Sequence, residues 1–129
     1  MITLGDFYRI KMDNDDGITP QGNDTYRYKY IIIIANNNNI LYGAVVTNTK
    51  DHPLIPIEFQ YPLNHNGHKC FVNCHKLYEV SPERLTQDCY QGNIADTDHY
   101  KYIVECVKTS PLLPKKKLKQ FGLLENENN

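Results

Sequence analysis

The sequence contains no tryptophan, no long apolar run and no marked excess of either charge, since its formal net charge is −1 over 129 residues. Domains that bind nucleic acid usually have a strongly basic composition, so any basic surface on this chain must be local. No apolar run approaches the ~20 residues that a membrane span requires, and the start MITLGDFYRI lacks a signal-peptide core. We therefore expect a cytoplasmic protein that does not enter a membrane.

Secretory features are also lacking, so the four cysteines indicate free thiols rather than a disulfide framework. Close CxxC pairs, typical of structural zinc sites, are absent as well, because Cys70 and Cys74 lie four residues apart on an expected strand and so ~13 Å from one another. An arrangement of His65, His68 and Cys70 around a turn is the remaining metal alternative. We favour no metal and no cofactor, with three cysteines as small apolar residues: Cys74, Cys89 and Cys106.

The chain does have an apolar centre between Tyr26 and Thr49. Two β-branched runs, at 31–34 and 40–46, flank the four asparagines at 36–39. Asparagine tolerates left-handed backbone, so this pattern predicts an antiparallel hairpin. The isoleucine run does not alternate with polar residues, which indicates a strand buried on both faces. Lys29, just before the first strand, and Thr47, at the end of the second, are therefore expected at the same end of the hairpin.

Tyrosines and cations alternate just ahead of the isoleucines. Tyr26, Tyr28 and Tyr30 share one face of the expected strand, while Arg27 and Lys29 share the other. We expect the cations to point outward and the tyrosines to pack against the barrel.

The rest of the chain predicts short strands and one helix. A polar loop over 13–25 precedes the hairpin. Ser81 followed by Pro82 predicts a helical turn over 81–85, and a stripe of apolar residues beginning near Tyr100 predicts an amphipathic helix. Further strands are expected at 4–11, 57–61, 70–74 and 77–80, with Pro62 ending the second of these.

These elements predict a mainly β (α+β) fold, a small SH3-like barrel with a C-terminal amphipathic helix, as one domain over 1–110. Residues 111–129 are expected to form an appended, flexible tail. The lysines between 115 and 119 are interpreted as part of a solvated end, with added affinity for RNA as the alternative.

The order of these pieces resembles a known family over nearly the whole chain to about Val107. The likeness rests on Gly5-Asp6-Phe7, Lys29-Tyr30 before the four isoleucines, Ala44-Val45-Val46-Thr47, Ile55-Pro56-Ile57, and Phe71 to Leu77 followed by Ser81 to Leu85 and a helix. In this order and spacing the chain resembles the MazF/PemK-like (Kid-like) toxins of bacterial toxin–antitoxin systems.

The resemblance implies a toxin endoribonuclease of the mRNA interferase type, an SH3-like barrel that forms a homodimer, cuts single-stranded RNA without a metal and is neutralised by a cognate antitoxin, a protein rather than an RNA. In that family an arginine precedes the first central strand and a threonine or serine ends the second. Lys29 and Thr47 take these places here. An arginine and an aspartate on a later strand correspond to Asn73 and His75, so this chain offers an imidazole in place of the carboxylate.

Metal-free RNA cleavage needs a base for the ribose 2′-hydroxyl, an acid for the leaving oxygen and a cation for the phosphorane. These needs point to Lys29, Thr47 and His75 as the candidate catalytic residues, because His75 is able to move protons near neutral pH while Lys29 stabilises charge. Arg27 would supply the guanidinium fork that lysine lacks. The candidate RNA-binding residues, which include tyrosines for stacking bases, are Arg27, Tyr26, Asn73, Lys50 and Tyr8.

Three alternatives remain open. The lysine and asparagine substitutions are consistent with a barrel that binds RNA or protein without cleaving. Residues 7–11 and 41–50 also resemble the type III toxins, which have the same barrel and an RNA antitoxin. A gyrase poison of the CcdB type depends on features of the terminal helix that this chain does not match.

Overall fold

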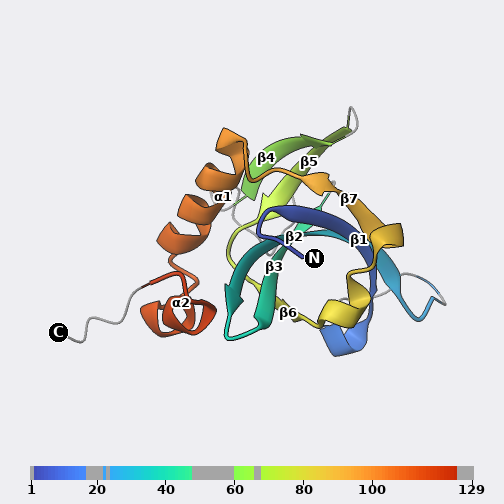
Figure 1. The fold of residues 1–129 in the computed structure, drawn as a ribbon, viewed down its shortest axis with the longest axis horizontal. Helices are drawn as coiled ribbons and strands as arrows, with labels where there is room; N and C mark the ends of the chain where they lie inside the picture. The colour runs from blue at the N-terminus through green and yellow to red at the C-terminus, as the bar shows by residue number, and fades with distance from the viewer. Residues whose placement is uncertain (1, 17–21, 23, 48–59, 66–67, 125–129) are drawn as a thin grey trace.

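The computed structural model describes residues 2–16, 22, 24–47, 60–65 and 68–124, and of Thr47 and residues 60–65 and 68–70 it describes only the backbone. Seven strands form one antiparallel sheet in the order β4-β5-β3-β2-β1-β7, with β6 paired to β3 (Figure 1). The strands are β1 (Asp6–Met12), β2 (Arg27–Asn37), β3 (Ile40–Thr47), β4 (Gln60–His65), β5 (His68–Asn73), β6 (Tyr78–Val80) and β7 (Tyr90–Asn93).

The expected hairpin is the centre of the sheet and is formed by β2 and β3. Its two-residue loop consists of Asn38 and Asn39, with φ of 54° and 67°, so both lie in the left-handed region that such tight hairpins require. The isoleucines at 31–34 are at most 1 % exposed, which confirms a strand buried on both faces. An irregularity in the register between Ile33 and Ala35 marks a bulge in β2.

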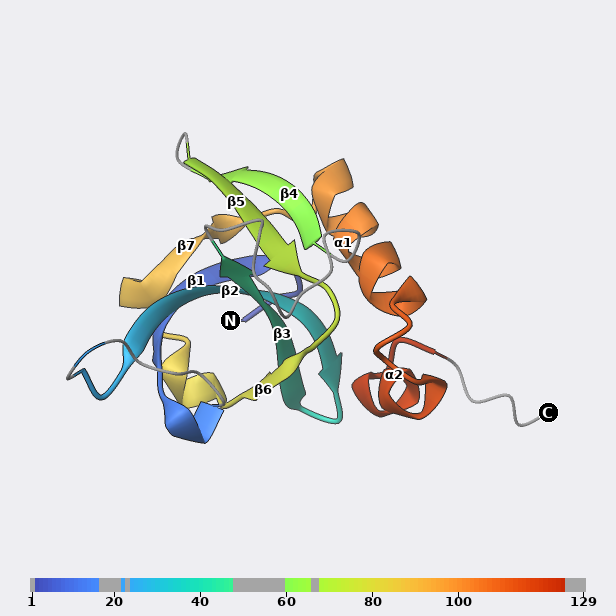
Figure 2. The ribbon, with the colours of Figure 1, turned by 180° about the vertical axis from the view of Figure 1, so that it is seen from behind.

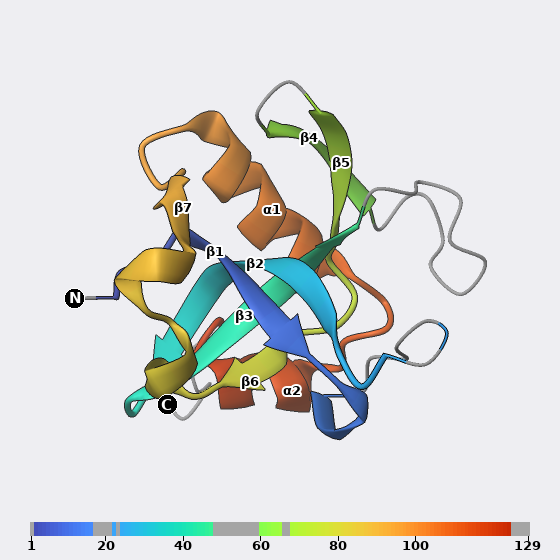
Figure 3. The same cartoon turned by 90° about the vertical axis from the view of Figure 1, so that its right-hand side faces the viewer.

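Each face of the sheet has its own apolar core. The helix face, which includes Phe7, Ile32 and Ala44, packs against the helices α1 (Asp98–Thr109) and α2 (Lys115–Phe121) (Figure 2). The opposite face, here called the inner face, includes Tyr8 and Ile31 among its buried residues. The 3₁₀ turns η3 (Pro82–Arg84) and η4 (Gln87–Cys89) lie on the side of β2 and β3 away from the helices (Figure 3).

The C-terminal helices confirm one expectation and correct another. Helix α1 buries Ile103 and Val107, as the apolar stripe predicts. A flexible tail is expected from residue 111, whereas the structure has α2 there, with Leu118 and Phe121 buried against the helix face. Gly122, with φ of 80°, ends α2 by donating to the carbonyl of Lys119. No helix in the described part of the chain is long and apolar enough to cross a membrane.

The strand expected to end at Pro62 continues to His65 in β4, where Pro62 lies opposite Phe71. Proline is tolerated there because β4 is an edge strand, with one side outside the hydrogen-bonded ladder. Gly92 and Asn93, a glycine–asparagine pair that indicates a break in the sequence, instead belong to β7, which forms the other edge. Within the described residues β4 and β7 do not pair, so the structure has a mainly β sheet with two C-terminal helices and does not show a closed barrel.

Candidate functional site

The hairpin register places Lys29 and Thr47 next to each other at one end of β2 and β3. Tyr30 of β2 lies opposite Val46 of β3. Because the strands are antiparallel, Lys29, one residue before Tyr30, lies opposite Thr47, one residue after Val46. Thr47 in turn lies opposite Phe71 of β5. The sequence-based expectation that the hairpin brings these two site residues together is therefore supported by the register, at the level of the backbone.

Lys29 lies on the inner face, because it is paired with Ile10 of β1, an inner-face residue that is 3 % exposed. Burial disfavours the ammonium form and lowers the pKa of Lys29 below its ordinary value of 10.5, and the positive charge of Arg27 lowers it further. In the described residues no carboxylate forms an ion pair with Lys29. The result is a partly buried cation without a charge partner among these residues, which suits a group that meets an anionic ligand.

Of the remaining candidates, the structure brings Asn73 and His75 into contact with each other. Asn73 lies two residues beyond Phe71 on β5, on the same face, roughly 7–8 Å diagonally from the Thr47 position. Its side-chain oxygen accepts a hydrogen bond of 3.1 Å from the backbone N–H of His75 and also contacts Nδ1 of the His75 ring. An amide oxygen only accepts, so this contact fits the tautomer with the hydrogen on Nδ1 and the lone pair on Nε2.

One of the proposed RNA-binding residues, Tyr8, does not join this group. Tyr8 is only 4 % exposed, and its hydroxyl donates to Asp6 at 3.0 Å. Burial and the Asp6 carboxylate raise the pKa of Tyr8 to about 12. A ring so enclosed offers no face to a base, so we drop Tyr8 as a stacking residue. Lys50 lies outside the described residues.

Tyr26 and Tyr28 lie on the helix face, and the expectation that they pack against the barrel is wrong. They are 38 % and 44 % exposed, because the helices cover this face only as far as Tyr30. Lys11 of β1 lies opposite Tyr28, and opposed residues share a face. The alternation at 26–30 predicts two faces correctly, but it does not tell which one the helices cover.

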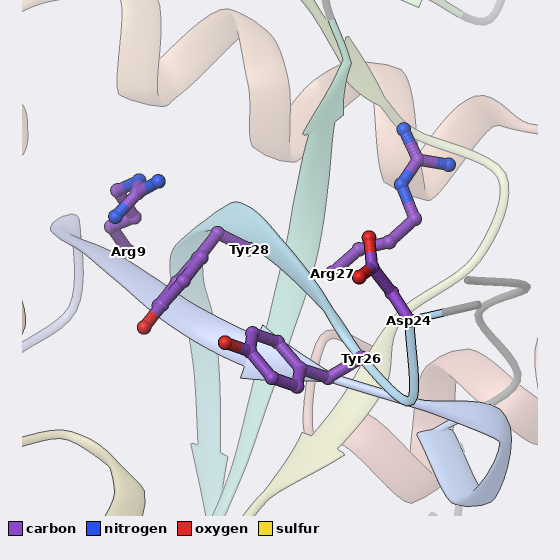
Figure 4. A pocket seen from close by; sticks show the side chains of 5 residues that line it. All are labelled: Arg9, Asp24, Tyr26, Arg27 and Tyr28. Atoms are coloured by element: carbon purple, nitrogen blue, oxygen red, sulfur yellow. The ribbon is translucent and has the colours of Figure 1, made fainter. Parts of the chain in front are cut away.

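The exposed tyrosines form a cluster with two cations of β1, Arg9 and Lys11, of which Figure 4 shows Arg9 beside the two rings. The rings of Tyr26 and Tyr28 are 5.5 Å apart and nearly perpendicular. The guanidinium carbon of Arg9 lies 4.0 Å from the centre of the Tyr28 ring, and Nζ of Lys11 lies 4.6 Å from that of Tyr26. We call these four residues the basic–aromatic platform. The alternation of Arg9 and Lys11 in β1 is the sequence signal that could have indicated it.

Arg27 lies at the strand end where the two faces meet. It shares a groove of about 390 Å³ with Arg9, Asp24, Tyr26 and Tyr28, and its side chain leaves the strand on the side of Asp24, away from the tyrosine rings (Figure 4). Arg27 therefore connects the inner-face site with the platform.

Two further observations bear on this site: the possible metal ligands and the comparisons with known proteins. Among the described residues, no group of three histidine, cysteine, aspartate or glutamate side chains is placed to hold a metal ion. The side chains of the alternative metal site at His65, His68 and Cys70 lie outside the described part of the chain. No protein-family model matches the sequence, and comparison with curated proteins finds no significant match.

Proposed function

We propose that this protein is an endoribonuclease that cleaves single-stranded RNA without a metal. The site is the inner face of the sheet where β2 begins and β3 ends. The observation that carries the proposal is the partly buried Lys29 beside the Thr47 position, on the face that also holds Asn73. A buried cation without a carboxylate partner among the described residues has a cost in stability, and such groups are typical of functional sites.

The residues fit attack by the ribose 2′-hydroxyl on the adjacent phosphate. Nε2 of His75 takes the hydroxyl proton, and the new O–P bond forms as the bond to the 5′-oxygen breaks. Lys29 stabilises the extra negative charge of the phosphorane, and Arg27 adds a bidentate contact to a phosphate oxygen. Asn73 keeps the histidine ring in the tautomer that accepts this proton. Water donates a proton to the leaving 5′-oxygen, and His75 passes the proton it has taken to the solvent, so the products are a 2′,3′-cyclic phosphate and a 5′-hydroxyl.

The biological setting follows from the resemblance alone. On this proposal the sheet is the SH3-like barrel of a MazF/PemK-like toxin, the protein acts as a cytoplasmic homodimer, and a cognate antitoxin occupies the RNA site. A protein antitoxin is the first expectation and an RNA antitoxin the second.

Cleavage of a long mixed-sequence RNA by the purified chain in EDTA tests the proposal, with cut sites mapped by primer extension and ends identified by mass. We expect discrete cuts at a short motif and cyclic phosphate ends. Lys29→Ala and His75→Ala should each remove the cuts, whereas the exposed Lys101→Ala of α1 should not. Cuts that survive both changes, or that require a divalent ion, would contradict the assigned site.

A non-catalytic RNA-binding protein is the second candidate. It is favoured by the basic–aromatic platform, because those side chains lie on the helix face and the proposed chemistry on the inner face does not use them. A folded chain that binds RNA and makes no cuts would support it.

A further inference from the structure

We infer that the basic–aromatic platform formed by Arg9, Lys11, Tyr26 and Tyr28 is a docking site for the unpaired bases and phosphates of single-stranded RNA. The platform would be a second RNA contact, on the opposite side of the sheet from the inner-face site. It rests on the proposed RNA substrate and does not require that the RNA be cleaved.

The two tyrosine rings are unusually accessible for residues of a strand next to the apolar core. Phe7 and Tyr30, whose ring centres are 5.7 Å apart, mark the end of the covered part of the helix face. Beyond them Tyr28 and Tyr26 extend into solvent, with Tyr28 44 % exposed. Adjacent exposed aromatic rings provide surfaces on which successive bases stack, and every base has a face that suits them.

The cations lie where the phosphates of a stacked strand would run. Arg9 and Lys11 alternate on β1, and their charged groups lie over one face of the Tyr28 ring and of the Tyr26 ring. Neither cation forms an ion pair with a carboxylate of the described residues. Arg27 adds a third positive charge at the groove, against the single carboxylate of Asp24. The guanidinium of Arg9, which stacks over Tyr28, also presents a flat surface to a base.

The same features favour RNA over a protein segment. The described residues that line this groove are two tyrosines, two arginines and one aspartate, so the groove itself has no aliphatic side chain to receive the apolar anchor of a peptide. Ile10 and Cys89 line a separate groove on the other side of Arg9 and Lys11. Alternating rings and cations match instead the alternation of bases and phosphates along a single strand.

The test is the affinity of the full chain for a fluorescent 12-nucleotide mixed-sequence RNA carrying 2′-O-methyl groups, measured by anisotropy. This probe has no free 2′-hydroxyl, so binding is measured without cleavage. Stacking on an aromatic ring contributes about 1–3 kcal/mol per base, so Tyr26→Ala and Tyr28→Ala should each raise Kd about 5- to 150-fold. Tyr28→Phe keeps the ring and should bind as the unchanged protein does. Tyr102→Ala on α1, where the tyrosine is 53 % exposed, is the matched control and should also leave Kd unchanged.

Salt dependence separates phosphate contacts from stacking. Arg9→Gln and Lys11→Gln should each reduce the slope of log Kd against log salt concentration by about 0.7, the value for one phosphate contact on a single strand. A fully paired RNA hairpin of the same charge should bind more weakly, because its bases are not available to the rings. Equal binding of hairpin and single strand, or unchanged affinity in both tyrosine-to-alanine variants, would overturn the inference.

Cleavage of unmodified RNA, followed in parallel, distinguishes this inference from the proposed function. Ring-dependent binding without any cuts would support the platform and contradict the nuclease. Cuts with an unchanged KM in Tyr26→Ala and Tyr28→Ala would support the nuclease and contradict the platform. A folded chain with no affinity for the probe would overturn the platform as an RNA site and direct attention to an anionic protein segment.

Discussion

Arg84 and Asp16 form a two-pronged ion pair, with Nη1 2.8 Å from Oδ1 and Nη2 3.1 Å from Oδ2. Nη2 of Arg84 also donates to the backbone carbonyl of Lys11. Asp16 ends the short turn η1 (Asn14–Asp16) that follows β1, so one side chain of η3 fixes the position of the segment that leaves this strand. That segment begins next to the platform residue Lys11.

Removal of this fork should destabilise the fold. Arg84→Ala should lower the free energy of unfolding by about 1–2 kcal/mol, because both charge-assisted bonds and the contact to Lys11 are lost at a partly buried site. Arg84→Lys keeps the charge but not the planar fork, so it should recover only part of the loss. Urea unfolding measures both, with the exposed Lys116→Ala on α2 as control. Equal stability of Arg84→Ala and the unchanged protein would contradict the role.

Asp6 should make the fold sensitive to acid. Burial raises its pKa, but the hydrogen bonds from Thr3, Asn93 and Tyr8 outweigh this, so the net pKa is lowered below 3.8. A carboxylate with a lowered pKa contributes stability above its ordinary pKa, and this stability is lost as the pH falls through the folded value. Asp6→Ala should therefore cost about 2–4 kcal/mol at neutral pH, with a difference that shrinks as the pH falls below 3.8. The exposed Asp15→Ala is the control, and a cost that does not vary with pH would argue against this linkage.

Replacement of Lys29 should stabilise the fold and abolish cleavage. Because burial and Arg27 lower its pKa, the ammonium form disfavours the fold below the folded pKa, and this disadvantage disappears as the pH rises towards 10.5. Lys29→Met should then raise the free energy of unfolding by about 0.5–1 kcal/mol at neutral pH, with less effect in alkaline buffer. The same variant should lower the cleavage rate at least about 100-fold. Lys101→Met should change neither quantity, and a loss of stability in Lys29→Met would mean that the lysine has a structural role.

The hairpin turn should respond to glycine and alanine in opposite directions. Asn39 has a φ of 67°, where a side chain with Cβ is strained and glycine is not. Asn39→Ala should therefore cost about 1 kcal/mol, while Asn39→Gly should be neutral or stabilising by a few tenths of a kcal/mol. Thermal unfolding of both variants checks the sign. A stabilising alanine would show that the turn adopts a different geometry in solution.

The hairpin and the helix α1 could be predicted from local sequence. Asparagines between two apolar runs strongly favour a tight turn, and an apolar stripe at helical spacing strongly favours an amphipathic helix. Helix α2 was missed because Pro111, Pro114 and the lysines suggest an unstructured end. Its apolar residues Leu118 and Phe121, three apart and followed by Gly122, were the available signal. The continuation of β4 through Pro62 was not predictable, because it depends on which strand lies at the edge of the sheet.

The candidate site could be predicted only as far as the hairpin determines it. The antiparallel register brings Lys29 beside Thr47, and this follows from sequence. The contact of His75 with Asn73 depends on a turn after β5, and the exposure of Tyr26 and Tyr28 depends on where the helices end on the sheet. Both features depend on contacts between elements, which the residue pattern along one strand does not determine.

Phe121 of α2 packs on Tyr42 of the central hairpin with ring centres 4.8 Å apart, and the side-chain amide of Asn37 donates to the carbonyl of Gln120 at 2.8 Å. Protein synthesis makes the hairpin long before α2. On the ribosome, the part of the helix face that α2 covers therefore remains exposed until α2 has emerged, after α1. Apolar surface exposed in this way favours association between unfinished chains, and the helix face is closed only after almost all of the described chain has been made.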